Sequence, residues 1–186
     1  MYYGGYDNGG EVVLEGDVNE AERWFRLAAK QGNAAAQHML GIMYWDNYND
    51  LDKDAAESLR WCRLAAKQGY SPAQNRLGRM YRADIPYFVE RDTLEAARWF
   101  RLAAEQGDAE AQWALGQLYA KGDGVPKDLV LAHMWCKISI FGHGEFIDHS
   151  DLPKFEELEK EMTRDEIVAA NLRATVCIES KYQNCG

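Results

Sequence analysis

The fold is decided by the stretch Ala97-Arg-Trp-Phe-Arg-Leu-Ala-Ala-Glu-Gln-Gly107, because this stretch recurs along the chain. Closely similar stretches begin at Ala21 and Leu59, and a degenerate copy begins at Ala132. The tryptophans of the four copies lie 37, 38 and 36 residues apart. A fixed period of this length indicates a repeat protein, in which each repeat is one small unit of secondary structure. The repeated tryptophans are Trp24, Trp61, Trp99 and Trp135.

A second shared block follows each of the first three copies. It reads Ala111-Gln-Trp-Ala-Leu-Gly-Gln-Leu-Tyr119 in the third repeat, and matching blocks begin at Ala36 and Ala73. Both kinds of block place apolar residues at the three- and four-residue spacing of a helix that is buried on one side. A glycine stands between the blocks and suits the left-handed residue that ends a helix. Each repeat is therefore predicted to be two helices, with the first ending at Gly32, Gly69 or Gly107.

The repeats are expected to stack, because one helix pair cannot bury its apolar residues alone. We expect the repeated tryptophans and tyrosines to pack in the shared core. A glycine within the second helix, at Gly41, Gly78 and Gly116, would let two helices approach closely. The residue after each tryptophan is also predicted to be buried. These residues are Phe25, Cys62, Phe100 and Cys136, and the two cysteines lie too many repeats apart to form a disulfide.

Composition and charge exclude several classes of protein. The chain has 186 residues, of which 47% are hydrophobic and 27% charged, and this balance excludes wholesale disorder. The formal net charge of −9 disfavours binding to the phosphates of nucleic acids. No apolar run approaches the ~20 residues that cross a bilayer, so no membrane span is predicted. The first seven residues lack the basic and apolar regions of a signal peptide.

These blocks resemble the Sel-1-like repeat (SLR) family, which is related to the tetratricopeptide (TPR) repeats. The resemblance rests on W-[FC]-R-L-A-A-x-Q-G followed by A-Q-x-x-L-G-x-x-Y. It also rests on Tyr119-Ala-Lys-Gly-Asp-Gly-Val-Pro-Lys-Asp128, which matches the family's Y-x-x-G-x-G-V-x-x-D loop. The resemblance extends from about residue 6 to residue 144. It implies an all-α fold, a right-handed α/α superhelix (a solenoid of helix hairpins) that serves as a binding surface. The family has no general catalytic motif, so we predict neither enzyme activity nor a cofactor.

Three regions are predicted on this basis. Residues 1–20 would be a partial first repeat, residues 21–144 the repeats, and residues 145–186 a pair of C-terminal capping helices with a tail. In that pair, one helix is expected over residues 152–162. Thr163-Arg-Asp-Glu166 is predicted to be the capping box that opens the other helix. We also expect that the chain begins partway through a repeat, as a trimmed or matured protein would.

Cys177 and Cys185 lie eight residues apart, the second of them beyond the expected end of the last helix. Their spacing resembles that of the bridges in secreted, cysteine-rich members of the family, and the resemblance implies a disulfide. The alternative is a pair of unbridged tail thiols. A disulfide would indicate an oxidising compartment, such as the bacterial periplasm or the outside of the cell, whereas without it a cytoplasmic location stays open.

Basic residues recur on the polar side of the first helix of each repeat, and Arg76, Arg79 and Arg82 add to them in the middle repeat. Stacking would align them into a basic band, which could grip an acidic or carboxylate-bearing segment of a partner. The alternative is a solvated surface whose arginines pair with acids of the first twenty residues, the loop around Asp50 and the tail. The candidate binding residues of the band are Arg23, Arg26, Arg60, Arg63, Arg98 and Arg101.

Aromatic residues in the connecting loops are the second candidate for partner binding. Trp45 and Tyr48 stand between the first two repeats, and Tyr87 and Phe88 belong to the long apolar loop that follows Arg82. Aromatic side chains on loops commonly anchor protein interfaces. They could equally fold down over the stacked helices, and the sequence does not decide between these two interpretations.

No metal site is predicted. Asp50, Asp52 and Asp54 alternate like the start of a calcium loop, but Ala55 and Trp61 replace the glycine and glutamate that such a loop requires. The two histidines and three carboxylates between residues 142 and 151 fit no structural zinc spacing. We interpret that stretch as a solvated polar loop.

The sequence therefore predicts a non-catalytic protein–protein interaction module that acts as an adaptor or scaffold in the bacterial cell envelope. The alternative is an immunity or inhibitor protein that covers a secreted toxin, since its acidic charge would steer it onto a basic enzyme. A cell-wall-directed enzyme is the least favoured function, because no catalytic cluster stands out. The expected partner is a protein of unspecified identity, and neither nucleic acid nor a small molecule is expected to bind.

Overall fold

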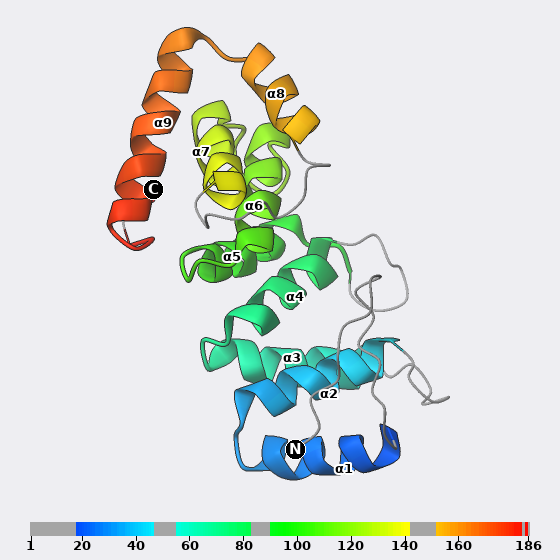
Figure 1. The fold of residues 1–186 in the computed structure, drawn as a ribbon. Helices are drawn as coiled ribbons and strands as arrows, with labels where there is room; N and C mark the ends of the chain where they lie inside the picture. Colours follow the sequence, from blue (N-terminus) through cyan, green and yellow to red (C-terminus); the bar gives the residue numbers. More distant parts are fainter. Residues whose placement is uncertain (1–17, 47–54, 83–89, 142–151, 184, 186) are drawn as a thin grey trace. The chain divides into compact units, whose positions relative to one another are not determined.

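The computed structural model describes residues 18–46, 55–82, 90–141, 152–183 and 185. Every regular element in these ranges is an α-helix (Figure 1). The helices are α1 (Val18–Lys30), α2 (Ala34–Asp46), α3 (Ala55–Lys67), α4 (Ser71–Arg82), α5 (Thr93–Ala104), α6 (Ala109–Lys121), α7 (Leu129–Phe141), α8 (Leu152–Lys160) and α9 (Arg164–Glu179). The predicted all-α fold of repeated helix hairpins is thereby confirmed.

The helices follow the repeated blocks of the sequence. α1, α3, α5 and α7 carry the tryptophan block, whereas α2, α4 and α6 carry the block that ends in tyrosine. The glycine between the two blocks has a φ of +88° at Gly32, +83° at Gly69 and +87° at Gly107. This left-handed conformation ends the first helix at little steric cost only for glycine, so the predicted helix–glycine–helix repeat is confirmed.

The contacts between residues divide the chain into two compact units, Met1–Gln68 and Gly69–Gly186. In the first unit, α2 packs against both α1 and α3. Leu40, Met43 and Trp61 lie at the centre of this packing and are buried. The side chain of Asn33 begins α2, because its Oδ1 accepts a hydrogen bond from the Ala36 N–H at 2.9 Å.

In the second unit, α5 to α9 contribute buried residues to one main core, and α4 packs against α5. The largest side chains of this core include Phe100, Leu115 and Met134, all fully buried. The last helix, α9, packs along α7 (Figure 1). As predicted, a capping box opens α9: the Thr163 hydroxyl accepts from the Glu166 N–H, and the Glu166 carboxylate accepts from the Thr163 N–H.

Glutamines link successive repeats within each unit. In the first unit, Gln37 donates from Nε2 to the Ala29 carbonyl at 3.1 Å, and its Oε1 accepts from Gln68 Nε2 at 2.7 Å. The Ala29 carbonyl lies in the last turn of α1 and also accepts from the Gly32 N–H at 3.0 Å, so the side chain of Gln37 adds a second hydrogen bond to it. The corresponding contacts of the second unit are Gln112 to the Ala104 carbonyl at 3.1 Å and Gln106 to Gln74 at 2.6 Å.

The predicted burial of the repeated tryptophans is wrong for Trp24. Trp61 and Trp135 are buried and Trp99 is half-buried, but Trp24 is 59% exposed. A tryptophan at this position is covered by the second helix of the preceding repeat, as α2 covers Trp61 and α6 covers Trp135. No helix precedes α1 among the described residues, so Trp24 lacks this cover.

Candidate functional site

Helices α4, α6 and α7 line an open pocket of about 400 Å³. Asn75, Arg79 and Arg82 lie along one side of α4 and form the first wall. α6 contributes the second wall, and the last turn of α7 contributes the third with Ser139 and Ile140. Three helices of the second unit thus bring side chains together that are far apart in the sequence.

Arg82 brings a half-buried positive charge to this pocket. Its guanidinium carbon lies 5.2 Å from the centre of the Phe100 ring, a distance at which the ring attracts a cation. Burial lowers the pKa of Arg82, the nearby Arg79 lowers it further, and Asp123 acts in the opposite direction. Among the residues that the structure describes, none forms an ion pair or a hydrogen bond with the Arg82 guanidinium.

Arg79 and Glu110 face each other between α4 and α6. Their closest charged atoms, Arg79 Nη1 and Glu110 Oε2, lie 3.8 Å apart. Asn75 Nδ2 donates to the same carboxylate oxygen at 3.1 Å. Because both charged side chains are well exposed, this ion pair is weak and either group can turn to a ligand.

The rest of the pocket lining is mixed, with Gln117 and Ser139 beside the apolar Trp113 and Ile140. Trp113 of α6 is half-buried and packs against a small cluster of buried side chains that includes Ile140 and Phe155. This packing fixes the indole as a wall beside the arginines. The pocket therefore offers two cationic groups, one carboxylate and an aromatic surface.

Sequence reasoning did not single out Asn75, Glu110, Trp113 or Gln117 as site residues. The signal lies in the second block, A-Q-x-x-L-G-x-x-Y, when its copies are compared with one another. Asn75 and Trp113 occupy the same variable position in two repeats, and Arg79 and Gln117 occupy another. Most of the residues that are identical in each copy are buried in the packing of the helices, whereas these variable residues share the helix side that lines the pocket.

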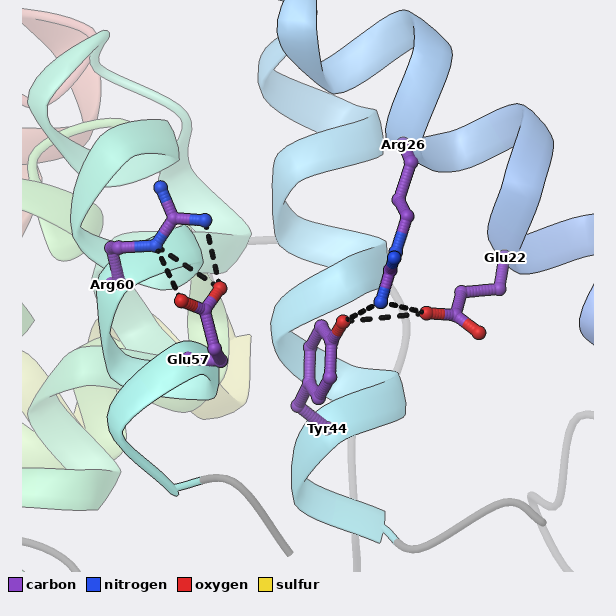
Figure 2. A network of polar contacts seen from close by, with 5 residues as sticks. All are labelled: Glu22, Arg26, Tyr44, Glu57 and Arg60. Atoms are coloured by element: carbon purple, nitrogen blue, oxygen red, sulfur yellow. Dashed lines mark hydrogen bonds and ion pairs between the residues drawn. The ribbon is translucent and has the colours of Figure 1, made fainter. Parts of the chain in front are cut away.

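The arginines predicted to form a basic band are largely engaged within their own helices. Arg26 pairs with Glu22 at 2.6 Å, and Arg60 forms a two-pronged contact with Glu57, closest at 2.7 Å (Figure 2). Arg98 forms a single contact with Glu95, at 3.1 Å. These acids lie one helical turn away. The acids of residues 1–17 and of the loop around Asp50, which the alternative interpretation named as partners, lie outside the described residues, so that interpretation stays a prediction.

Two of these arginines also join the helices of their own repeats. Arg26 contacts the hydroxyl of Tyr44 on α2 (Figure 2). Arg101 contacts the hydroxyl of Tyr119 on α6. In both pairs the guanidinium carbon lies 5.9 Å from the ring centre. The equal spacing of the two pairs along the sequence makes this a recurring structural contact. Arg23 and Arg63 are exposed, and a partner-binding role of the band stays a prediction.

The aromatic candidates are only partly described. Trp45, near the end of α2, is half-buried. Tyr48, Tyr87 and Phe88 lie outside the described residues, so their predicted role as anchors is neither supported nor opposed by the structure. In sequence register, Trp45 holds the position that Arg82 holds in the next repeat.

Cys177 and Cys185 form a disulfide, with their Cα atoms 4.6 Å apart. Cys62 and Cys136 are buried and lie outside this bridge. Among the described residues there is no group of three or more side chains that could hold a metal ion. The aspartates from Asp50 to Asp54 and the polar stretch 142–151 fall outside those residues. None of the described helices has the length and apolar character needed to cross a membrane.

Comparison with known proteins places these features in context. The model of the Sel1 repeat family matches residues 1–33, 34–70, 71–108 and 109–140. The crystal structure of a Sel1 repeat protein from Oxalobacter formigenes is similar, with a TM-score of 0.62 and 31% sequence identity over 73% of this chain and 96% of that one. A search of curated proteins found no match.

A second solved structure, that of c5321, is also similar. It is a protective antigen present in uropathogenic Escherichia coli strains and displays an SLR fold. The TM-score is 0.62 and the sequence identity 25%, over 91% of this chain and 44% of the antigen. The chain therefore spans less than half of the antigen's length.

Proposed function

Since the chain belongs to the Sel1 repeat family, whose non-catalytic repeats generally serve as protein-interaction modules, we propose that it is an adaptor that binds a segment of a partner protein. The proposed binding site is the pocket lined by α4, α6 and α7. The partner would lie against the second helices of the middle repeats, with one or two of its side chains in the pocket.

The observation that carries this proposal is the convergence of Arg79, Arg82 and Trp113 on one pocket. Arginine and tryptophan are enriched among the residues that dominate binding energy in protein interfaces. A volume of about 400 Å³ accommodates a few side chains, and it lies at the small end of the range typical of ligand pockets. The site thus suits a short segment of a partner better than a broad, flat surface.

The cell envelope of a bacterium is the proposed location. The disulfide between Cys177 and Cys185 supports an oxidising compartment, because such bonds persist there and are rare in the cytosol. The two similar solved structures are of bacterial proteins, which supports a bacterial setting. In this location the chain would act as a scaffold between envelope proteins.

A second candidate function is that of an immunity protein that covers a secreted toxin. The net charge of −9 favours it, because an acidic protein is steered rapidly onto a basic enzyme. This function predicts a single partner bound tightly and in equal stoichiometry, with association that slows as salt rises. An adaptor would instead capture more than one protein.

Site-specific photo-crosslinking tests the proposed site. A photoreactive benzoylphenylalanine replaces Gln117 in the pocket or, as a control, the exposed Glu157 on α8. The full chain is then irradiated in an extract of the cells that produce it. We expect products from the Gln117 probe that excess unlabelled chain suppresses, and no such products from the Glu157 probe. A third probe at Arg63 tests the basic band.

The identity and number of the products separate the proposed functions. Several proteins captured at Gln117 support the adaptor, and one protein captured stoichiometrically supports the immunity role. Products at Arg63 but not at Gln117 would move the binding site to the basic band. If all three probes give the same products, or the Gln117 probe gives none, the proposed pocket site is wrong.

A further inference from the structure

We propose that the pocket binds a carboxylate of a peptide segment, with the Arg82 guanidinium as its anchor and an apolar residue beside the acid packed on Trp113. This inference rests on the proposed function and adds the chemistry of the segment that is bound. The sequence of the partner would therefore contain an aspartate or glutamate next to an aliphatic or aromatic residue.

The first step of the argument is the state of Arg82. Its guanidinium is half-buried, stacks on Phe100 at 5.2 Å, and forms no ion pair with any residue that the structure describes. A positive charge that is partly removed from water is stabilised by a carboxylate with matching hydrogen-bond geometry. Phe100 is itself fully buried, so it holds the arginine in one place before a ligand arrives.

The second step concerns the charge that the pocket accepts. Arg79 and Arg82 contribute two positive charges, and Glu110 contributes one negative charge. The excess of one positive charge matches a single carboxylate. A doubly charged phosphate would meet the Glu110 carboxylate, which lies 3.8 Å from Arg79 and is held by Asn75 at 3.1 Å. The pocket therefore favours an acidic side chain over a phosphorylated one.

The third step is the apolar wall. Trp113 is fixed from behind by the cluster that contains Ile140 and Phe155, so its exposed part presents a rigid surface. Apolar area on a rigid aromatic side chain is covered at low entropic cost when a ligand binds. Since this surface and the arginines line the same pocket, one peptide can reach both.

Selection from a library of random twelve-residue peptides displayed on phage, against the full chain, tests the inference. We expect the selected peptides to be enriched in aspartate or glutamate next to an apolar residue. The affinity of a selected peptide is then measured with purified variants. Arg82→Gln should weaken it about ten- to hundredfold, the usual worth of a hydrogen bond to a charged group. Arg173→Gln, an equal charge change at an exposed site on α9, should leave it unchanged.

A variant that improves binding excludes misfolding as the cause of the change in affinity, because a misfolded protein would bind more weakly. Glu110→Gln removes the carboxylate that opposes the ligand and keeps a similar shape, so the acidic peptide should bind about two- to fivefold more tightly. Replacing the acid of the peptide by its amide should remove the difference between wild type and Arg82→Gln. A phosphoserine peptide with the same flanks should bind more weakly than the glutamate peptide.

The outcomes distinguish this inference from the function on which it rests. Selected peptides without acids, or equal affinities of wild type and Arg82→Gln, would overturn the carboxylate site while leaving a peptide-binding module in place. Tighter binding of the phosphoserine peptide would overturn the preference for a carboxylate. A failure to select any peptide, together with no crosslinking at Gln117, would contradict both proposals.

Discussion

Gly78 and Phe100 touch so closely that no side chain fits between them: a Cβ on Gly78 would lie 2.6 Å from the Phe100 ring. The same relationship joins Gly116 to Cys136, where the distance from a Cβ to Sγ would be 2.4 Å, and Gly41 to Cys62, where it would be 2.3 Å. The glycine of each second helix thus meets the residue after the tryptophan in the next first helix. This contact sets the spacing between successive repeats.

The first prediction follows from this contact. Gly78→Ala should lower the free energy of unfolding by about 1–3 kcal/mol, because the added methyl group overpacks a fully buried ring that has no room to move. At an open helix position the same change would stabilise the protein by up to about 1 kcal/mol, so the sign of the effect is decisive. Urea unfolding measures it, with Lys121→Ala, at an exposed position of α6, as the control.

The second prediction concerns the glutamines that link the repeats. Gln112 is fully buried and donates to the Ala104 carbonyl, which also accepts from the Gly107 N–H at 3.0 Å. Gln112→Met should therefore remove one of two hydrogen bonds to that carbonyl and cost about 0.5–1.5 kcal/mol. Gln106→Met should cost much less, because Gln106 is exposed and water can replace its contact with Gln74. Equal losses in urea unfolding for the two variants would contradict this reason.

Much of the fold could be predicted from the sequence, because the same packing contacts recur in successive repeats. The two-helix repeat, the helix-ending glycines such as Gly69 and the capping box at Thr163 are all confirmed. Trp24 was the exception. The repeat pattern shows which position of the repeat a residue occupies, but it does not show whether a neighbouring helix covers that residue. The 59% exposure of Trp24 reflects the absence of a preceding helix among the described residues.

The candidate site was less predictable, for a physical reason. Repetition shows which residues pack, and Arg26 and Arg101 recur because they contact Tyr44 and Tyr119 within their repeats. The residues proposed to bind a partner differ between repeats, so a comparison that averages the copies hides them. Arg82 stands out only when its stacking on Phe100 is known. The recurring arginines were therefore more visible in the sequence than the pocket.

The third prediction is a dependence on pH that arises at the start of α9. Hydrogen bonds from the Thr163 N–H and hydroxyl, each 2.8 Å long, lower the pKa of Glu166 below its ordinary value of 4.5. A lowered pKa in the folded state means that ionised Glu166 stabilises the protein fully above that value, and that this contribution is lost as the pH falls through the lower, folded pKa.

Measurement of unfolding at pH 7 and at pH 3 for wild type and Glu166→Gln checks this prediction. The stability difference between the two proteins should be larger at pH 7 and should shrink at pH 3. Thr163→Ala should cost about 1 kcal/mol at pH 7, because it removes the N-cap. Glu156→Gln, on the exposed side of α8, serves as the control. A difference that does not change with pH would rule out the proposed role of the carboxylate.

The fourth prediction concerns the bridge between Cys177 and Cys185. It closes a short loop, for which chain entropy predicts a stabilisation of about 2.5 kcal/mol. Within this loop the Tyr182 N–H donates to the Cys177 carbonyl at 2.8 Å, and the Tyr182 ring lies 3.1 Å from where a Cβ on Gly107 would be. The bridge therefore fixes the tail against the turn between α5 and α6, and its loss should loosen both.

Thiol counting and unfolding together check this bridge. Unfolded protein without reductant should show two reactive thiols, those of Cys62 and Cys136, and four after reduction. A variant with Cys177→Ala and Cys185→Ala should match reduced wild type in stability and should not respond to reductant. Four thiols before reduction in protein isolated from its native compartment would contradict the bridge. The main support for an oxidising location would then be lost, because Cys62 and Cys136 are buried core residues that are compatible with any compartment.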